Sequence, residues 1–252
     1  MEPTKGYVVV ASTKKVFYNF AINLMESLRD FYPEANIAFY TEDRFLDGRE
    51  KIADVVESVG GNKREKLDGM ARSPWDITFY IDADTEIEHE DIEHVFNEMG
   101  DYDLVFTGLP PERHYCYAEV FFEGARKPNG DKGGFELCGA VCLYDMRKQL
   151  VREFMRDWYD LTLKQYSGEW WPRDENGNED LKNFPATLKR WDQFTLWWLT
   201  NREPKYKDLK VGIFEDDARW NWYTKYKPGH NVNPIVIRHY SSSGAKQINF
   251  DI

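Results

Sequence analysis

Short apolar runs alternate with amphipathic stretches over the first part of the chain. The apolar runs are rich in β-branched and aromatic residues, which predicts buried strands at residues 6–13, 36–43, 75–84 and 102–108. Between these runs apolar residues recur at helical spacing, which predicts helices at residues 16–33, 63–72 and 91–99. Strands that alternate with helices are typical of a mostly parallel sheet with helices on both faces. We therefore predict an α/β fold.

The second half of the chain is patterned differently. It predicts a strand at residues 135–145, a long amphipathic helix at 146–166, a helix at 190–201 and a strand at 234–240. The segment 168–187 is irregular and polar, and its Trp170 and Trp171 either form part of a lid over an acceptor or belong to the core. Because the sequence has no repeat, linker or low-complexity tail, we expect residues 1–252 to form a single domain.

The composition limits the possible partners. Hydrophobic residues make up 42% of the chain and aromatic residues 16%, which is ample for a buried core. A formal net charge of -11 argues against broad, non-specific binding to phosphate backbones, which needs a basic surface. Basic runs at residues 14–16, 62–66 and 188–190 could each line a local groove, but such runs are more often solvated, and we interpret all three in that way.

Three further features bear on the compartment. No apolar run approaches the length that spans a bilayer. The first residues lack the basic start and the small-residue cleavage site of a signal peptide. The cysteines Cys116, Cys138 and Cys142 make neither an even disulfide set nor a zinc pattern, and we expect Cys138 and Cys142 to pack as small apolar groups. These features predict a cytoplasmic protein in a reducing compartment.

Two carboxylates one residue apart end the apolar run at residues 75–84. Asp82 and Asp84 would repel each other in so small a space, so a positive charge must favour the pair. Carboxylate oxygens after a buried strand suit Mg²⁺ or Mn²⁺. The alternative is that Asp84 or Thr85 begins a helix as its N-cap.

A second group of polar residues follows the predicted strand at 234–240. His239 could supply a nitrogen ligand for Mn²⁺. Gly244 would allow a phosphate to approach the backbone closely, and Lys246 would supply a positive charge to its oxygens. The alternative is an edge strand followed by a disordered tail.

Five stretches, in this order, resemble glycosyltransferases of the GT-A fold. They are "FYIDADTEIEHEDIEHVF" at 79–96, "CGAVCLYD" at 138–145, "WDQFTLWWL" at 191–199, "ARWNWY" at 218–223 and "PIVIRHYSSSGAK" at 234–246. The chain is most similar to the glycogenin and bacterial lipopolysaccharide galactosyltransferase family, glycosyltransferase family 8. The resemblance implies a single Rossmann-like GT-A domain with a nucleotide-binding half at 1–110 and an elaborated acceptor or catalytic half at 111–252.

The resemblance also implies an activity: metal-dependent transfer of a sugar from a nucleotide-diphosphate sugar, by default a UDP-sugar, with retention at the anomeric carbon. Asp82, Asp84 and His239 would bind Mn²⁺ or Mg²⁺, while Asp192 and Gln193 would be catalytic. The residues implied in donor binding are Ala11, Ser12, Thr13, Lys66, Asp82, Ala83, Gly139, Ala140, Gly244 and Lys246. For Asp192 and Gln193 the alternative is the N-cap of a helix.

The sequence departs from the family pattern at four places. Gly244 follows His239 after five residues instead of three, and Gln247 and Ile248 stand where the family has proline and tryptophan. Cys138 stands where the family has asparagine, and Lys14 stands where an acidic residue is common. The acceptor is open between a saccharide such as lipopolysaccharide, a protein side chain and a modified DNA base.

Other functions remain as alternatives. An inverting enzyme would use Glu215, Asp216 or Asp217 as its base. A catalytically silent nucleotide- or sugar-binding module would keep the fold without the reaction. A sugar nucleotidyltransferase would need a Gly-rich, Arg-containing loop after the first strand, and the sequence there, "VVVASTKKVF", has none.

Overall fold

The computed structural model describes residues 2–62, 64–109, 136–223 and 234–240. Gly244, Lys246 and Cys116 lie outside these residues. Within the described ranges, no helix combines the length and the apolar character that crossing a membrane requires.

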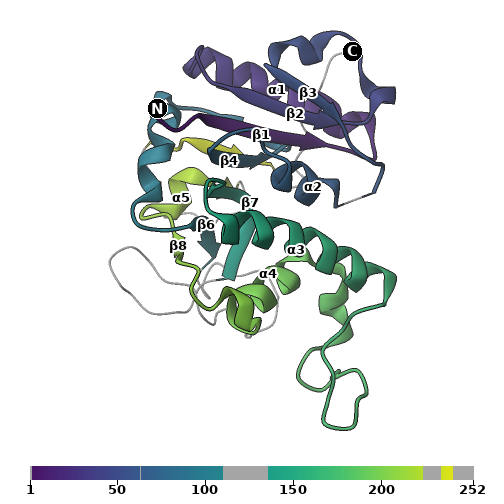
Figure 1. Cartoon of the computed structure of the whole chain (residues 1–252). Coiled ribbons are helices and arrows are strands. Elements are labelled where there is room, and N and C mark those ends of the chain that lie inside the picture. Colours follow the sequence, from purple (N-terminus) through teal and green to yellow (C-terminus); the bar gives the residue numbers. More distant parts are fainter. Residues whose placement is uncertain (1, 63, 110–135, 224–233, 241–252) are drawn as a thin grey trace.

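A seven-stranded sheet forms the centre of the fold (Figure 1). Its strands, in spatial order, are β3 (Val55–Ser58), β2 (Ile37–Thr41), β1 (Lys5–Ala11), β4 (Ile77–Asp82), β7 (Glu136–Asp145), β6 (Leu104–Leu109) and β8 (Val211–Ile213). Only β7 runs antiparallel to its neighbours β4 and β6, and the other paired strands of this sheet are parallel. The predicted mostly parallel α/β sheet is confirmed.

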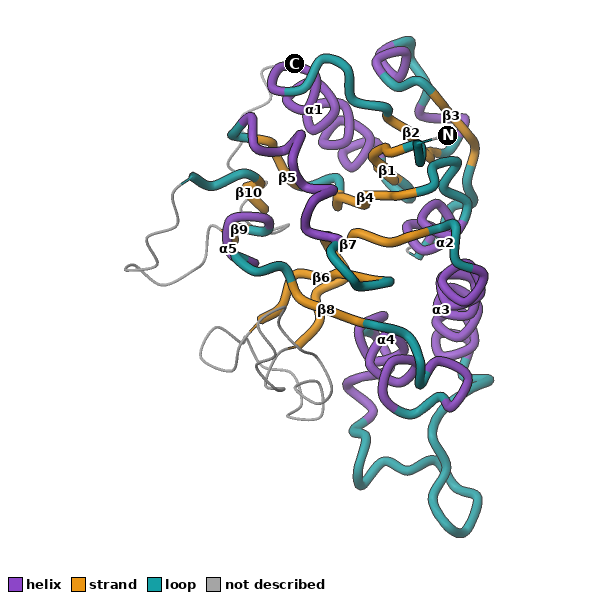
Figure 2. The backbone as a smooth tube through the Cα atoms, turned by 60° about the vertical axis from the view of Figure 1, so that its left-hand side comes forward, coloured by secondary structure: helices purple, strands orange, loops and turns teal. Residues whose placement is uncertain are grey.

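Helices cover both faces of this sheet. The α-helices are α1 (Lys15–Phe31), α2 (Glu65–Ala71), α3 (Gln149–Ser167), α4 (Asp192–Asn201) and α5 (Asp217–Trp220). The 3-10 helices are η1 (Asp43–Phe45), η2 (Arg49–Ile52), η3 (Glu90–Met99), η6 (Ala186–Arg190) and η7 (Pro204–Tyr206). Figure 2 shows α2, α3 and α4 along one side of the sheet, with α1 on the other. The helix predicted at 91–99 is present as η3.

The alternation of side chains along β1 explains these two layers. Tyr7 and Val9 pack into the core under α1 and η3, whereas Val8 and Val10 pack into the core under α2, α3 and α4. Successive side chains of a strand point to opposite faces, so a continuous apolar run serves both cores.

A second, three-stranded sheet was not predicted as such. It has the order β5-β10-β9, with β5 (Thr85–Ile87), β10 (Ile237–His239) and β9 (Trp222–Tyr223). Thr85 begins β5 three residues after Asp82, the last residue of β4, so the alternative of a helix N-cap at Asp84 or Thr85 is wrong. Because β10 lies between β5 and β9, the alternative of an edge strand at His239 is wrong as well.

The segment 168–187 is irregular, as predicted, apart from a bridge between Arg173 and Glu179. Trp171 is only 2% exposed, and its ring centroid lies 4.7 Å from that of Phe194 in α4. Trp170 is partly buried against the same group of aromatic side chains. Of the two interpretations of these tryptophans, the structure supports the core for Trp171. Cys138 and Cys142 are buried free thiols, as expected.

Helix α2 packs unusually close to β1. A Cβ atom at Gly69 would lie 2.5 Å from Val10 Cγ2 and 3.2 Å from the ring of Tyr40. Only glycine permits this approach without a shift of its neighbours. The contact sets the position of α2, which carries Lys66.

We predict that Gly69→Ala destabilises the protein. Overpacking costs about 1–3 kcal/mol, whereas the better helix propensity of alanine returns only about 1 kcal/mol. The expected net result is a melting temperature lower by about 3–6 °C, measured by calorimetry.

The double variant Val10→Ala/Gly69→Ala is the matched control. Removal of the Val10 methyl groups makes room for the new one, so this double variant should melt above Val10→Ala alone. A Gly69→Ala variant as stable as the original protein would contradict the close approach.

Candidate functional site

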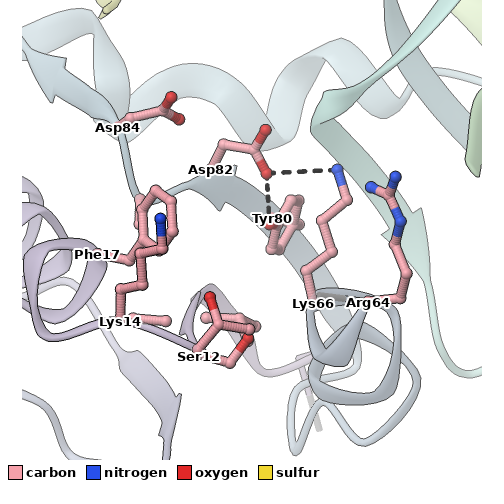
Figure 3. Close-up of a pocket in the computed structure, with 12 residues that line it drawn as sticks. Ser12, Lys14, Phe17, Arg64, Lys66, Tyr80, Asp82 and Asp84 are labelled. Atoms are coloured by element: carbon pink, nitrogen blue, oxygen red, sulfur yellow. Dashed lines mark hydrogen bonds and ion pairs between the residues drawn. The ribbon is translucent and has the colours of Figure 1, made fainter. Parts of the chain in front are cut away.

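A cavity of about 460 Å³ lies beyond the carboxyl ends of β1 and β4 (Figure 3). Its lining residues come from the end of β1 and the following loop, from α1, from the region of α2 and from the end of β4. They are Val10, Ala11, Ser12, Thr13, Lys14, Phe17, Arg64, Lys66, Tyr80, Asp82, Ala83 and Asp84. Ligands of open α/β sheets bind at this edge.

Six of the ten predicted donor-binding residues line this cavity: Ala11, Ser12, Thr13, Lys66, Asp82 and Ala83. Hydrogen bonds to other segments hold the loop between β1 and α1 in place. Ser12 Oγ donates to the backbone oxygen of Asn62 at 3.0 Å, and the backbone N–H of Thr13 donates to Glu42 Oε1. Thr13 has a φ of 70°, which a β-branched residue rarely adopts.

The three predicted metal ligands lie together. Asp82, Asp84 and His239 each offer a ligand atom, and these atoms all lie within 4.8 Å of one another. His239 reaches the two carboxylates because β10 pairs with β5, with His239 opposite Thr85, and because the Tyr240 N–H donates to the Asp84 carbonyl at 2.9 Å. Two carboxylates and an imidazole form a donor set that suits Mn²⁺ or Mg²⁺.

The imidazole of His239 is buried, and other side chains contact both of its nitrogens and one face of its ring. Its Nδ1 lies 2.9 Å from Asn221 Oδ1, and its Nε2 lies 3.3 Å from Asp84 Oδ1. The ring of Tyr223 stacks on it, with centroids 4.2 Å apart and planes 23° apart. The ring therefore has little freedom to turn.

Asp192 joins the site from α4, through ion pairs. Its carboxylate lies 3.1 Å from Lys66 Nζ and 3.2 Å from Arg64 Nη1. Lys66 Nζ also lies 3.6 Å from Asp82 Oδ1, which accepts a hydrogen bond of 2.5 Å from Tyr80 Oη. Trp191 is the N-cap of α4 and Asp192 is its first residue, so the alternative of an N-cap at Asp192 is wrong. Gln193 is partly exposed beside it and is not among the residues that line the cavity.

The two carboxylates that contact Lys66 are shifted in opposite directions. Burial raises the pKa of Asp82, and the charge of Asp84 adds to this, while Lys66 opposes it. Burial also acts to raise the pKa of Asp192, but Lys66 and Arg64 outweigh it, so the pKa falls below its ordinary value. Asp192 is therefore ionised at neutral pH, whereas for Asp82 additional positive charge would favour the ionised form.

The amine of Lys66 is held in its charged form. Burial alone would lower its pKa, but Asp192 and Asp82 raise it above its ordinary value. Lys66 is therefore protonated at neutral pH.

The predicted donor residues of β7 have different positions. A Cβ at Gly139 would lie 3.0 Å from the Trp158 ring, so Gly139 packs under α3 and is not among the residues that line the cavity. Ala140 lies one residue beyond the Ile81–Val141 pair, at the level of Asp82.

Two of the three candidate bases of an inverting enzyme can be placed relative to the cavity. Glu215 and Asp216 are exposed and are absent from the described residues that line it. The side chain of Asp217 is outside the described part of the structure.

Sequence reasoning missed several residues of the site, among them Arg64, Tyr80, Asn221 and Tyr223. The basic run at 62–66 was interpreted as solvated, and this was wrong, because the side chains of Arg64 and Lys66 are only 18% and 20% exposed and pair with Asp192. Asn221 and Tyr223 lie in the "ARWNWY" stretch, which carried the resemblance but had no role assigned to it.

Comparison with known proteins supports the fold. No protein-family model and no curated protein matches the chain. Among solved structures, the galactosyltransferase LgtC in complex with donor and acceptor sugar analogs is similar, with a TM-score of 0.54, 14% identity, and coverage of 93% of this chain and 86% of that one. An active-site mutant of LgtC gives a TM-score of 0.54 at 13% identity, with the same coverage. The chain therefore has the GT-A fold, as predicted.

We predict that Lys66→Met lowers the free energy of unfolding at neutral pH. Removal of one partner of a buried ion pair leaves an uncompensated charge, which costs up to about 3–5 kcal/mol. Denaturant unfolding of the purified protein measures this loss.

Two further variants separate charge from packing. Lys66→Arg keeps the charge and should be less destabilised than Lys66→Met. The double variant Lys66→Met/Asp192→Asn removes one of the two acids that Lys66 contacts and should be more stable than Lys66→Met. If Asp192→Asn lowers the free energy of unfolding of Lys66→Met still further, Lys66 does not compensate the charge of Asp192.

Proposed function

We propose that this protein is a glycosyltransferase that moves a sugar from a nucleotide-diphosphate sugar, by default a UDP-sugar, to an acceptor, with a divalent cation and with retention. One observation carries the proposal: Asp82, Asp84 and His239 converge at the cavity beyond β1 and β4 of a GT-A fold. LgtC, which has this fold, is a galactosyltransferase whose structure contains donor and acceptor sugar analogs.

Asp82, Asp84 and His239 would hold Mn²⁺ or Mg²⁺. The donor set fits either ion, and the imidazole nitrogen favours Mn²⁺. When bound, the ion supplies positive charge to the diphosphate, whose negative charge grows as it leaves. The raised pKa of Asp82 supports this assignment, because an additional positive charge would favour its ionised form.

The donor would lie along the cavity. Ala11, Ser12 and Thr13 would contact the nucleobase and ribose. Lys66, whose charge its acidic neighbours secure, would contact the donor beside Asp82 and Ala83. Gly244 and Lys246, outside the described residues, would add contacts to the phosphates.

Asp192 and Gln193 would act on the sugar side. Because the pKa of Asp192 is lowered, its carboxylate accepts hydrogen bonds and does not donate a proton at neutral pH. It would therefore orient a hydroxyl of the donor sugar or of the acceptor. Gln193 can both donate and accept.

These residue roles assign a function to each half of the chain. Residues 1–110 would bind the nucleotide, and residues 111–252 would supply Asp192, His239 and the acceptor side of the same domain. The acceptor would be a saccharide such as lipopolysaccharide, a protein side chain or a modified DNA base.

Retention is the stereochemical outcome we propose. Exposed Glu215 and Asp216 are not at the cavity, which disfavours them as bases for inversion. A catalytically silent binding module is the competing function, and donor hydrolysis distinguishes the two.

We predict that the protein hydrolyses a nucleotide-sugar in the presence of Mn²⁺, even without its acceptor. A panel of nucleotide-sugars with chromatographic detection of the released nucleotide measures this. A chelator should abolish hydrolysis and added Mn²⁺ should restore it. Asp84→Asn should nearly abolish it, because the metal loses a charged ligand.

Asp101→Asn is the control, since Asp101 is an exposed carboxylate outside the cavity. It should leave hydrolysis unchanged. Full activity of Asp84→Asn in chelator would contradict the metal assignment, and nucleotide binding without any turnover would favour the silent module.

We also predict that the first-formed product keeps the anomeric configuration of the donor. NMR of the reaction in progress observes this configuration before any slow equilibration. An inverted product would overturn the assignment to a retaining mechanism and would require a carboxylate base that we have not identified.

A further inference from the structure

Asn221 is a buried amide that is not among the described residues that line the cavity. It follows the short helix α5 and is 1% exposed. Its neighbours come from three other segments of the chain: Thr107 in β6, Cys138 in β7 and His239 in β10. A buried amide costs free energy unless its hydrogen bonds are satisfied, so these contacts define what the side chain does.

The two ends of the amide have different partners. Asn221 Nδ2 donates to Thr107 Oγ1 at 3.0 Å and lies 3.5 Å from Cys138 Sγ. Asn221 Oδ1 lies 2.9 Å from His239 Nδ1. An amide oxygen only accepts, so Nδ1 of the imidazole carries the proton. A neutral imidazole has one N–H, and Nε2 then keeps its lone pair.

Nε2 is the ring nitrogen on the side of the carboxylates. It lies 3.3 Å from Asp84 Oδ1, and a positive charge between the lone pair and this carboxylate would stabilise both. Stacking of Tyr223 holds the ring plane, and Tyr223 Oη in turn lies 3.4 Å from Cys138 Sγ. The surroundings of His239 thus present one defined nitrogen to the site.

We propose that Asn221 is a positioning residue that accepts the Nδ1 proton of His239 and thereby presents Nε2 as a ligand to a metal ion at Asp82 and Asp84. Hydrogen bonds from the second nitrogen of a metal-ligating imidazole generally fix its tautomer and orientation. Because a nitrogen ligand benefits Mn²⁺ more than Mg²⁺, Asn221 also sets the preference of the site for Mn²⁺. This inference rests on the metal site of the proposed function.

The test compares Asn221→Leu, which cannot accept a hydrogen bond, with Asn221→Asp, which can only accept. Electron paramagnetic resonance of free Mn²⁺ gives the affinity for Mn²⁺, and displacement by Mg²⁺ gives the second affinity. We expect Asn221→Leu to weaken Mn²⁺ binding about 10–100-fold, the usual effect of such a partner. The affinity for Mg²⁺ should change much less, and Asn221→Asp should bind Mn²⁺ about as well as the original protein.

His239→Ala supplies the reference background. If Asn221 acts only through His239, Asn221→Leu should weaken Mn²⁺ binding no further in a His239→Ala protein. Equal losses for Mn²⁺ and Mg²⁺ in both Asn221 variants would show a merely structural role and overturn the inference. Unchanged Mn²⁺ binding by Asn221→Leu would also overturn it.

A readout without metal separates this inference from the metal assignment. Nitrogen-15 NMR of the metal-free protein, at a pH where the imidazole is neutral, reports which ring nitrogen of His239 carries the proton. The resonances are assigned by their loss in His239→Ala among the five histidines. We expect Nδ1–H in the original protein and in Asn221→Asp, and a shift toward Nε2–H in Asn221→Leu.

The NMR readout tests the role of Asn221, and the Mn²⁺ binding readout tests the metal site. A proton on Nε2 in the original protein overturns the role of Asn221. Absence of Mn²⁺ binding by a protein with the expected Nδ1–H tautomer overturns the metal site of the proposed function, and the hydrogen bond from His239 to Asn221 stands.

Discussion

Repulsion among carboxylates is the constraint on which the rest of the site depends. Asp82 and Asp84 lie at one strand end, and Asp192 reaches the same region through a lysine that it shares with Asp82. In surroundings of low polarity such charges interact strongly, so each needs a compensating partner. The carboxylates differ in how much positive charge lies beside them. Asp192 pairs with both Arg64 and Lys66, whereas Asp82 has a longer contact with Lys66 and Asp84 lies beside the imidazole of His239. Positive charge is therefore scarcest at Asp82 and Asp84, where the proposed divalent cation would bind.

Two packing arrangements of the backbone fix the positions of these groups. Helix α2 brings Lys66 to the cavity, and the absence of a side chain at Gly69 lets that helix lie directly on β1. The small sheet brings His239 beside Asp84, although the two residues are far apart in the sequence. A charge is a useful ligand or counter-ion only if its distance is fixed, and both arrangements serve this purpose.

The sequence predicted the parts of the fold whose signal is local. Strands β1 and β4 are continuous apolar runs, and α1 and α3 have clear helical periodicity, so each could be identified from its own residues. Strand β3 has three exposed residues at a sheet edge, and β9 has only two residues, so neither has a pattern that distinguishes it from a loop. The predicted metal ligands also depended on local signals, namely polar residues directly after apolar strands.

The unpredicted residues depend on partners far away in the chain. The charged run that contains Arg64 resembles a solvated surface until Asp192 of α4 is placed against it. The role of Asn221 requires Thr107, Cys138 and His239, three residues that only the sheet pairings bring together. No spacing in the sequence encodes such a network. A polar residue in an apolar stretch, as in "ARWNWY", is the one signal that marks a buried amide in need of partners.

Strain in the loop after β1 shows how the other end of the cavity is shaped. Thr13 is a β-branched residue at a φ of 70°, a conformation that costs on the order of 1–3 kcal/mol. The carboxylate of Glu42, which also pairs with Arg44 at 2.7 Å, accepts the N–H of Thr13 and so offsets part of this cost. A glycine at position 13 would adopt the same backbone without strain but would lack the side chain of Thr13, a residue that lines the cavity. The chain thus accepts a backbone cost at the proposed nucleotide end, whereas at the metal end it relies on paired charges and satisfied hydrogen bonds.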